Sequence, residues 1–171
     1  MMGQWSIQDR RDGRVRLQLH ANARSNGLAS VSVQLALTQF QGLTEEQLGS
    51  SERVTFQLVR EAGTFSFSGS FRKRAGTGEW TLNPAPAFLA LLDGYGYVQP
   101  TARDLFALTA SDVNADYIAS IRSAGYNAIS LRELVALRSN GVDREFIEQL
   151  QQRGQQNLSA IRLLSLRTNG F

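Results

Sequence analysis

Hydrophobic and polar residues alternate with a period of two between Trp5 and Leu82. This alternation is typical of strands in an antiparallel sheet that buries one of its faces. Residues that favour tight turns divide the region at Asp12-Gly13, Asn26-Gly27 and Glu61-Ala62-Gly63. We predict five or six strands, interrupted by one helical turn after Thr44, because Thr44 and Gln47 have the spacing of a capping box.

The alternation ends near residue 83, and the hydrophobic spacing after it is helical. Residues 84–92 predict a short helix that stops at Gly94 and covers part of the apolar sheet face. From Thr101 onward the chain also repeats itself at an offset of 29 residues. Nine positions are identical between the two copies, for example Val113 with Val142 and Gly125 with Gly154. We therefore predict an array of helix-pair repeats.

Cap signals divide each copy into two short helices. Four residues are favourable N-caps, each with a hydrophobic residue before it and another four positions after it: Asn114, Ser130, Asp143 and Ser159. Glycines predict where the same helices stop, at Gly125, Gly141, Gly154 and Gly170. Thr101 and Asp104 predict the start of an earlier helix. Helices this short depend on packing against their neighbours.

These patterns predict an α+β fold with an N-terminal antiparallel β-meander and a C-terminal array of short helices. We expect an antiparallel sheet domain at 1–83, a covering helix and connector at 84–100, and a short-helix repeat domain at 101–171. A chain of 171 residues can bury a hydrophobic core without disulfides or metal. Its composition, 42% hydrophobic and 19% charged, argues against intrinsic disorder.

The composition leaves little material for catalysis. The chain has no Cys and one His, so it lacks the usual zinc ligands, and we predict neither a metal nor a cofactor. His20 lies among polar neighbours on an alternating strand, away from any nucleophile-elbow sequence, and we retain it only as a candidate binding residue. We expect a protein that is not an enzyme. One alternative stays open, a glycosidase-type carboxylate pair drawn from the 15 acidic residues.

Arginines carry most of the positive charge, although the formal net charge is only +3. Arg72, Lys73 and Arg74 precede a Gly-Thr-Gly segment that resembles a phosphate-binding loop but lacks the Gly-Lys-Ser/Thr of a P-loop, so we interpret it as a basic hairpin tip. Arg122, Arg138 and Arg167 each fall in the last turn of a predicted helix. We favour a structural role there, stabilising the helix dipole, over contacts with phosphates or an acidic partner.

The function that this sequence favours is a non-enzymatic protein-interaction or sensing module with a protein partner. The first alternative is a nucleic-acid or polyanion binder that uses the arginines named above. The second is a small-ligand site on the polar sheet face, for which a concave pocket would be the distinguishing observation. Its expected lining is Gln18, His20, Ser32, Gln34, Thr55, Gln57, Ser66 and Ser68.

Targeting signals give little information about location. No run of about 18 apolar residues occurs, so we expect no direct membrane insertion. The first residues lack the apolar core of a signal peptide. We expect a soluble chain, cytoplasmic by default and periplasmic if a leader or membrane segment has been removed.

Two stretches, residues 63–71 and 76–84, together with the Asn-Gly-Val of the repeats, resemble an uncharacterised bacterial domain. That domain is found alone or appended to membrane zinc metallopeptidases of the beta-lactam-sensor type. The peptidase motif His-Glu-x-x-His is absent here, so no protease activity follows. The resemblance implies an accessory sensing or interaction module, with cell-envelope signalling as its context.

Overall fold

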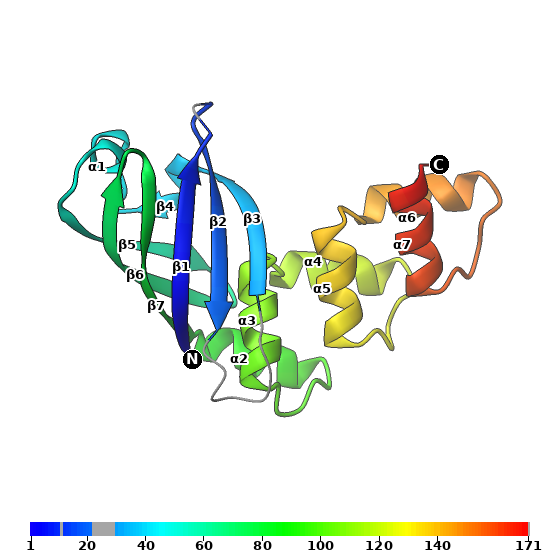
Figure 1. Ribbon diagram of the computed structural model, residues 1–171. Helices are drawn as coiled ribbons and strands as arrows, with labels where there is room; N and C mark the ends of the chain where they lie inside the picture. The colour runs from blue at the N-terminus through cyan, green and yellow to red at the C-terminus, as the bar shows by residue number, and fades with distance from the viewer. Residues whose placement is uncertain (11, 22–29, 171) are drawn as a thin grey trace. The chain divides into compact units, whose positions relative to one another are not determined.

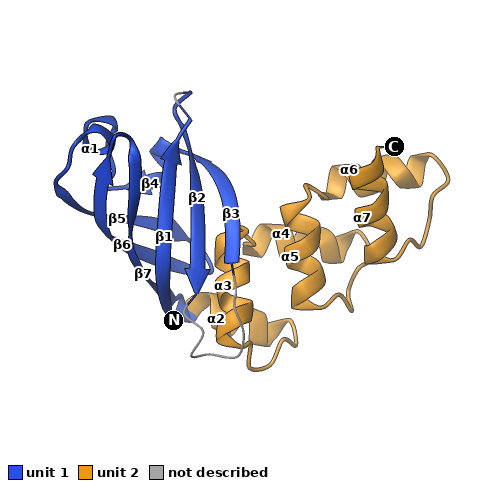
Figure 2. Cartoon of the chain, viewed as in Figure 1, with its two compact units in different colours: residues 1–86 blue, residues 87–171 orange. Residues whose placement is uncertain are grey.

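A computed structural model of the chain describes residues 1–10, 12–21 and 30–170. The chain divides into two compact units, Met1–Pro86 and Ala87–Phe171, which we call the sheet unit and the helical unit (Figure 2). The first holds an antiparallel sheet and the second an array of helices, which confirms the α+β prediction (Figure 1).

The sheet unit contains one curled sheet whose strands are all antiparallel, in the order β3-β2-β1-β7-β6-β5-β4. Its strands are β1 (Met2–Asp9), β2 (Arg14–Ala21), β3 (Ser30–Ala36), β4 (Phe40–Gln41), β5 (Arg53–Arg60), β6 (Gly63–Arg72) and β7 (Ala75–Pro84). The prediction of five or six strands is therefore wrong, since seven lie in the described residues. The short β4 follows a 3-10 turn, Leu37–Gln39, and is too brief to show alternation.

Short elements and turns in the sheet unit follow their sequence signals. Helix α1 (Glu45–Gly49) begins with the predicted capping box. The side chain of Thr44 accepts a hydrogen bond from the backbone N–H of Gln47, and the side chain of Gln47 accepts one from the backbone N–H of Thr44. Gly13 has a φ of +73° between β1 and β2, as a tight turn requires. The third predicted turn lies between Arg60 and Gly63, where β5 ends and β6 begins. The Asn26-Gly27 turn lies outside the described residues.

Aromatic rings fill the buried face of the sheet. Trp5 on β1 meets Phe56 on β5 edge to face, with 5.2 Å between ring centroids, although two strands separate β1 from β5. The curl of the sheet brings these distant strands together over one core. The Trp5 indole N–H also donates to the Ser68 carbonyl at 3.2 Å, which satisfies its buried polar atom.

Glycines make room for the largest of these rings. Trp5 lies opposite Gly78, Trp80 opposite Gly3 and Phe71 opposite Gly76 in the strand register. A Cβ added at Gly78 would lie 2.8 Å from Trp5 Nε1 and 2.6 Å from the Gly69 Cα. The glycines of the Gly-Thr-Gly segment therefore serve core packing: Gly76 is buried and Gly78 lies beneath the indole.

In its described residues, the helical unit consists of six short helices joined by brief loops. They are α2 (Pro86–Gly94), α3 (Ala102–Ala110), α4 (Ala115–Ser123), α5 (Leu131–Ser139), α6 (Arg144–Gln152) and α7 (Ala160–Asn169). All four predicted caps accept a hydrogen bond from the backbone N–H three residues later. The Thr101 capping box is also present. The four stop glycines all have positive φ.

The repeat begins one copy earlier than the sequence reasoning indicated. Residues 84–112 match 113–141 at the same 29-residue offset and share seven identities. A backbone bond of the helix-ending type recurs in all three copies, from Tyr97 N to Leu92 O, Tyr126 N to Ile121 O and Gln155 N to Leu150 O. Helix α2 continues through Gly94, and the residue with positive φ is Gly96, the counterpart of Gly125 and Gly154.

We call α3, α5 and α7 the second helices, because each is the second helix of its repeat. They stack in order, since α3 contacts α5 and α5 contacts α7. Tyrosines tie successive repeats together: Tyr97 Oη donates to the Ile129 carbonyl and Tyr117 Oη to the Val142 carbonyl, both at 2.7 Å. Each acceptor lies just before the N-cap of a helix in the next repeat, Ile129 before α5 and Val142 before α6, so each bond holds the start of that helix.

Candidate functional site

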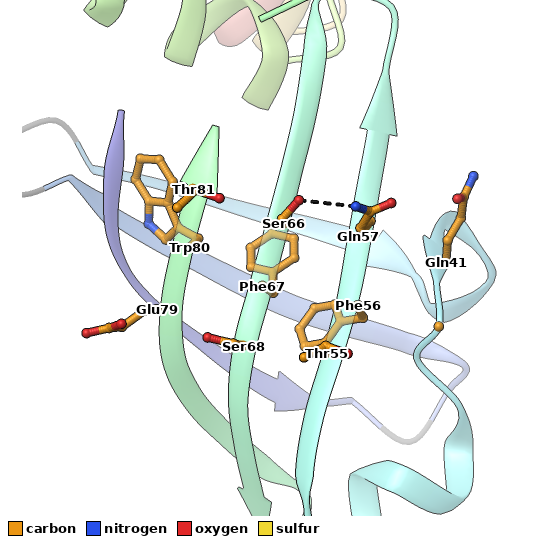
Figure 3. Close-up of a pocket in the computed structure, with 11 residues that line it drawn as sticks. Gln41, Thr55, Phe56, Gln57, Ser66, Phe67, Ser68, Glu79, Trp80 and Thr81 are labelled. Carbon is orange, nitrogen blue, oxygen red and sulfur yellow. Dashed lines mark hydrogen bonds between the residues drawn. The ribbon is translucent and has the colours of Figure 1, made fainter. Parts of the chain in front are cut away.

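The polar face of the sheet is hollowed over strands β4 to β7 (Figure 3). This first hollow has a volume of about 610 Å³, and six of its eleven lining residues carry hydroxyl or amide side chains. Its outward-facing side chains are Gln41, Thr55, Gln57, Ser66, Ser68, Glu79 and Thr81. A concave surface on the polar face is the observation that distinguishes a ligand site from a flat, hydrated sheet.

The strand register places these side chains in two rows. One row runs Gln41, Gln57, Ser66, Thr81, and the next runs Thr55, Ser68, Glu79. Gln57 Nε2 donates to Ser66 Oγ at 3.2 Å. Within the described part of the chain, the side chains of Thr55, Ser68 and Glu79 make no hydrogen bond or ion pair. Their donors and acceptors are free for a ligand.

A second hollow of about 410 Å³ adjoins the first, and Glu79 lines both. Its polar side chains are Gln4, Ser6, His20, Thr77 and Glu79. Gln4 lies beside Glu79 on one strand and beside His20 on the next, so the second row continues across β1 to β2.

The predicted lining divides between these hollows and the surface beside them. Thr55, Gln57, Ser66 and Ser68 line the first hollow and His20 the second. Neither hollow includes Gln18, Ser32 or Gln34, and Gln18 instead accepts a hydrogen bond from Ser6 Oγ. Sequence reasoning missed Gln41, Glu79 and Thr81, although Glu79 and Thr81 alternate with the buried Trp80 on their strand.

The three basic residues at 72–74 form the tip of the β6–β7 hairpin, as expected. Lys73 and Arg74 occupy the two turn positions, with φ of +51° and +64°. Arg74 forms ion pairs with Asp9 and, at 2.5 Å, with Glu45, and Glu45 hydrogen bonding is the main cause of the raised pKa of Arg74. Two acidic residues therefore offset the charge of Arg74, while Arg72 and Lys73 are exposed.

The arginines in the helical unit lie against aromatic rings. The Cζ atom of Arg122 is 4.9 Å from the Tyr95 ring centroid, that of Arg138 is 4.9 Å from Tyr117, and that of Arg167 is 5.0 Å from Phe146. Arg138 and Arg167 hold the same position in successive repeats, as do Tyr117 and Phe146. Arg122 belongs to the first helix of its repeat, so the three arginines do not share one repeat position.

Arg138 makes further contacts that hold its side chain in place. Its Nε donates to the Asp112 carbonyl at 3.2 Å, and its Nη2 lies 3.4 Å from the Asp112 carboxylate. Burial raises the pKa of Tyr117, and the nearby Arg138 opposes that rise. The cation–π contact occupies a face of the Arg138 guanidinium, and Asp112 engages two of its in-plane nitrogens, Nε and Nη2, so the surrounding protein already uses much of this side chain's binding capacity.

A smaller hollow of about 200 Å³ lies between the second helices α3 and α5. We call it the arginine-rimmed hollow; it is lined by Arg103, Asp104, Ala107, Leu131, Arg132 and Val135. Arg103 and Arg132 hold the same position in successive repeats and are exposed. In the described part of the chain neither side chain has a hydrogen-bond or ion-pair partner. On α7 the same position is Ile161, which is 75% exposed.

Comparisons with known proteins give no family for this chain: no family model, curated protein or solved structure matches it. In residues 1–10, 12–21 and 30–170 no three His, Asp or Glu side chains gather in a way that could hold a metal ion. Among the same residues, no helix has the length and apolar character needed to span a bilayer.

Proposed function

We propose that this protein is a non-enzymatic interaction module that binds an acidic segment of a partner protein along its second helices. The observation that supports it most is the pair of unpaired, exposed arginines on the rim of the arginine-rimmed hollow. The sequence patterns did not single out these two residues; the three arginines that they did single out in the helical unit, Arg122, Arg138 and Arg167, each lie over an aromatic ring. Arg103 and Arg132 are therefore better placed for an external carboxylate.

The chemistry of the partner follows from the hollow. Its floor is apolar, formed by Ala107, Leu131 and Val135, and its volume suits one aliphatic side chain rather than a drug-sized molecule. Packed helices lie about 8–10 Å apart, and an extended segment advances about 3.3 Å per residue. Two acidic residues about three positions apart in such a segment would therefore reach Arg103 on one helix and Arg132 on the next. We infer a segment with two acidic residues and an apolar residue between them.

Peptide display on the full chain tests this function. We expect the selected peptides to be enriched in that acidic-apolar pattern. The R103E/R132E variant should weaken their binding by at least about tenfold, because each charge pair becomes repulsive. The matched control is R14E/R53E, which makes the same charge change at two exposed residues of the sheet unit. Selection without acidic enrichment, or binding that survives R103E/R132E, would refute the proposal.

A nucleic acid or other polyanion is the second candidate for the same arginines. If the arginines bind a polyanion, the protein should be retained on heparin with a steep salt dependence. It should also show no preference for an apolar residue in the peptide segment. Val135→Asp distinguishes an acidic peptide from a polyanion. A carboxylate in the apolar floor should abolish binding of the peptide, which needs that floor, and should only reduce retention on heparin. A sensing role in cell-envelope signalling rests on the bacterial resemblance alone.

A further inference from the structure

We propose that the polar face of the sheet is a second binding site, which takes a neutral, hydroxyl-rich ligand of the oligosaccharide class. The site comprises the two adjoining hollows that share Glu79; Figure 3 shows the first of them. It lies wholly on the sheet unit and is independent of the interaction proposed for the helices.

The lining selects against anions. Glu79 is the one charged residue among the described side chains that line the first hollow, and no Arg or Lys accompanies it there. An exposed carboxylate without a cationic partner repels phosphates and carboxylates. The ligand is therefore neutral or positively charged.

The remaining polar groups match hydroxyls. Serine and threonine hydroxyls donate and accept, glutamine amides do both, and a carboxylate accepts through two oxygens. Sugars present adjacent hydroxyls that can donate in pairs to one carboxylate, and this gives Glu79 the role of bidentate acceptor. Ser68 is its neighbour in the row and Thr55 the next residue beyond, and neither side chain has a hydrogen-bond partner in the described part of the chain.

The site is long and is held by a rigid base. The row from Thr55 on β5 to His20 on β2 crosses four strand spacings, about 19 Å at about 4.8 Å each. A ligand that fills both hollows is therefore a short oligomer rather than a single small ring. Beneath this face the buried rings of Trp80, Phe67 and Phe56 hold the strands in register, so the polar groups are positioned before binding.

Amide chemical-shift mapping of the full chain with neutral oligosaccharides tests the site. The probes are the hexamers of the cellulose, chitin, maltose and xylan series at millimolar concentration. We expect at least one of them to shift amides of β5, β6, β7 and β1 around Glu79. Glu79→Gln should weaken that binding about tenfold, because it replaces one of the two carboxylate acceptor oxygens with an NH2 donor and removes the charge. Ser68→Ala should weaken it to a similar extent, because it removes a hydroxyl that faces the ligand. Ser32→Ala, on the same face outside both hollows, should leave it unchanged.

Two further outcomes would overturn the proposal. If none of the four oligosaccharides shifts these amides, the class is wrong. If spermine shifts them instead, and added salt abolishes that binding, Glu79 binds a cation rather than hydroxyls. Binding of a neutral sugar should instead be insensitive to salt. Thermal unfolding of each variant confirms that lost binding does not reflect lost folding.

Discussion

Arg138 provides the sharpest test of the claim that the repeat arginines are structural. Replacing it with alanine removes the cation–π contact with Tyr117, the hydrogen bond to the Asp112 carbonyl and the ion pair with Asp112. It also removes a positive charge from the last turn of α5.

The expected cost follows from these contacts. A cation–π contact at a partly exposed site contributes about 0.5–1 kcal/mol, and a hydrogen bond contributes about 0.5–1.5 kcal/mol. The helix-dipole contribution is about 0.3–1 kcal/mol, and the ion pair adds little because both side chains are about one-third exposed (33% and 38%). Arg138→Ala should therefore lower the unfolding free energy of the helical unit by about 2 kcal/mol. Arg132→Ala, which removes an unpartnered arginine from the same helix, should change it by less than about 0.5 kcal/mol.

Urea denaturation can resolve the two units. Far-UV circular dichroism follows the helices, while fluorescence follows the sheet unit, which contains both tryptophans, Trp5 and Trp80. A double-mutant cycle of Arg138→Ala with Tyr117→Leu should give a coupling of about 1 kcal/mol. If the coupling energy is near zero and Arg138→Ala lowers the unfolding free energy no more than Arg132→Ala does, Arg138 does not have the structural role described above. Loss of heparin retention in that case would favour the polyanion alternative.

Three other predictions concern the packing and the caps. Gly78→Ala should destabilise the sheet unit by about 3 kcal/mol or more, because its Cβ would meet Trp5 and the neighbouring backbone, whereas Gly49→Ala, with open space around it, should be close to neutral; fluorescence-detected unfolding compares them. Tyr117→Phe should cost the helical unit about 1 kcal/mol through loss of the bond to the Val142 carbonyl, measured by urea denaturation, and an unchanged midpoint would contradict that bond. Hydrogen bonds from Ser130 lower the pKa of Glu133 in the folded state, so its contribution to stability is complete above its ordinary pKa of about 4.3 and is lost as the pH falls through the lower folded value. Glu133→Gln should accordingly reduce the pH dependence of unfolding in that acidic range, and an identical pH profile would count against it.

The elements most visible in the sequence were those with strong local signals. Period-two alternation identified the long strands, and side-chain caps identified helices α3 to α7, because both signals depend only on neighbouring residues. The first repeat escaped detection because its signals are weak. Ala85 stands where Asn114 and Asp143 cap the later helices, and Asp112 stands where Gly141 ends one. Asp112 nevertheless has the positive φ, +55°, of its glycine counterparts.

The candidate sites depended on information that no local pattern carries. The polar sheet face was expected to offer a ligand site, but the register that places Glu79 beside Gln4 is set by a strand pairing distant in sequence. Likewise, the spacing of Arg103 and Arg132 identifies a shared repeat position only after the first repeat is recognised. The partner of each repeat arginine, an aromatic ring on another helix or loop, is a tertiary contact for the same reason.

A charge-swap measurement tests the proposed function most directly. The Kd of the best acidic peptide is measured by fluorescence anisotropy for the unmodified chain and for R103E/R132E, together with a peptide whose acidic residues are lysines. We predict that the chain binds only the acidic peptide and that R103E/R132E binds only the lysine peptide, because the apolar floor is unchanged and only the rim charge reverses. If R103E/R132E binds the acidic peptide as tightly as the unmodified chain does, the arginine-rimmed hollow is not the interaction site.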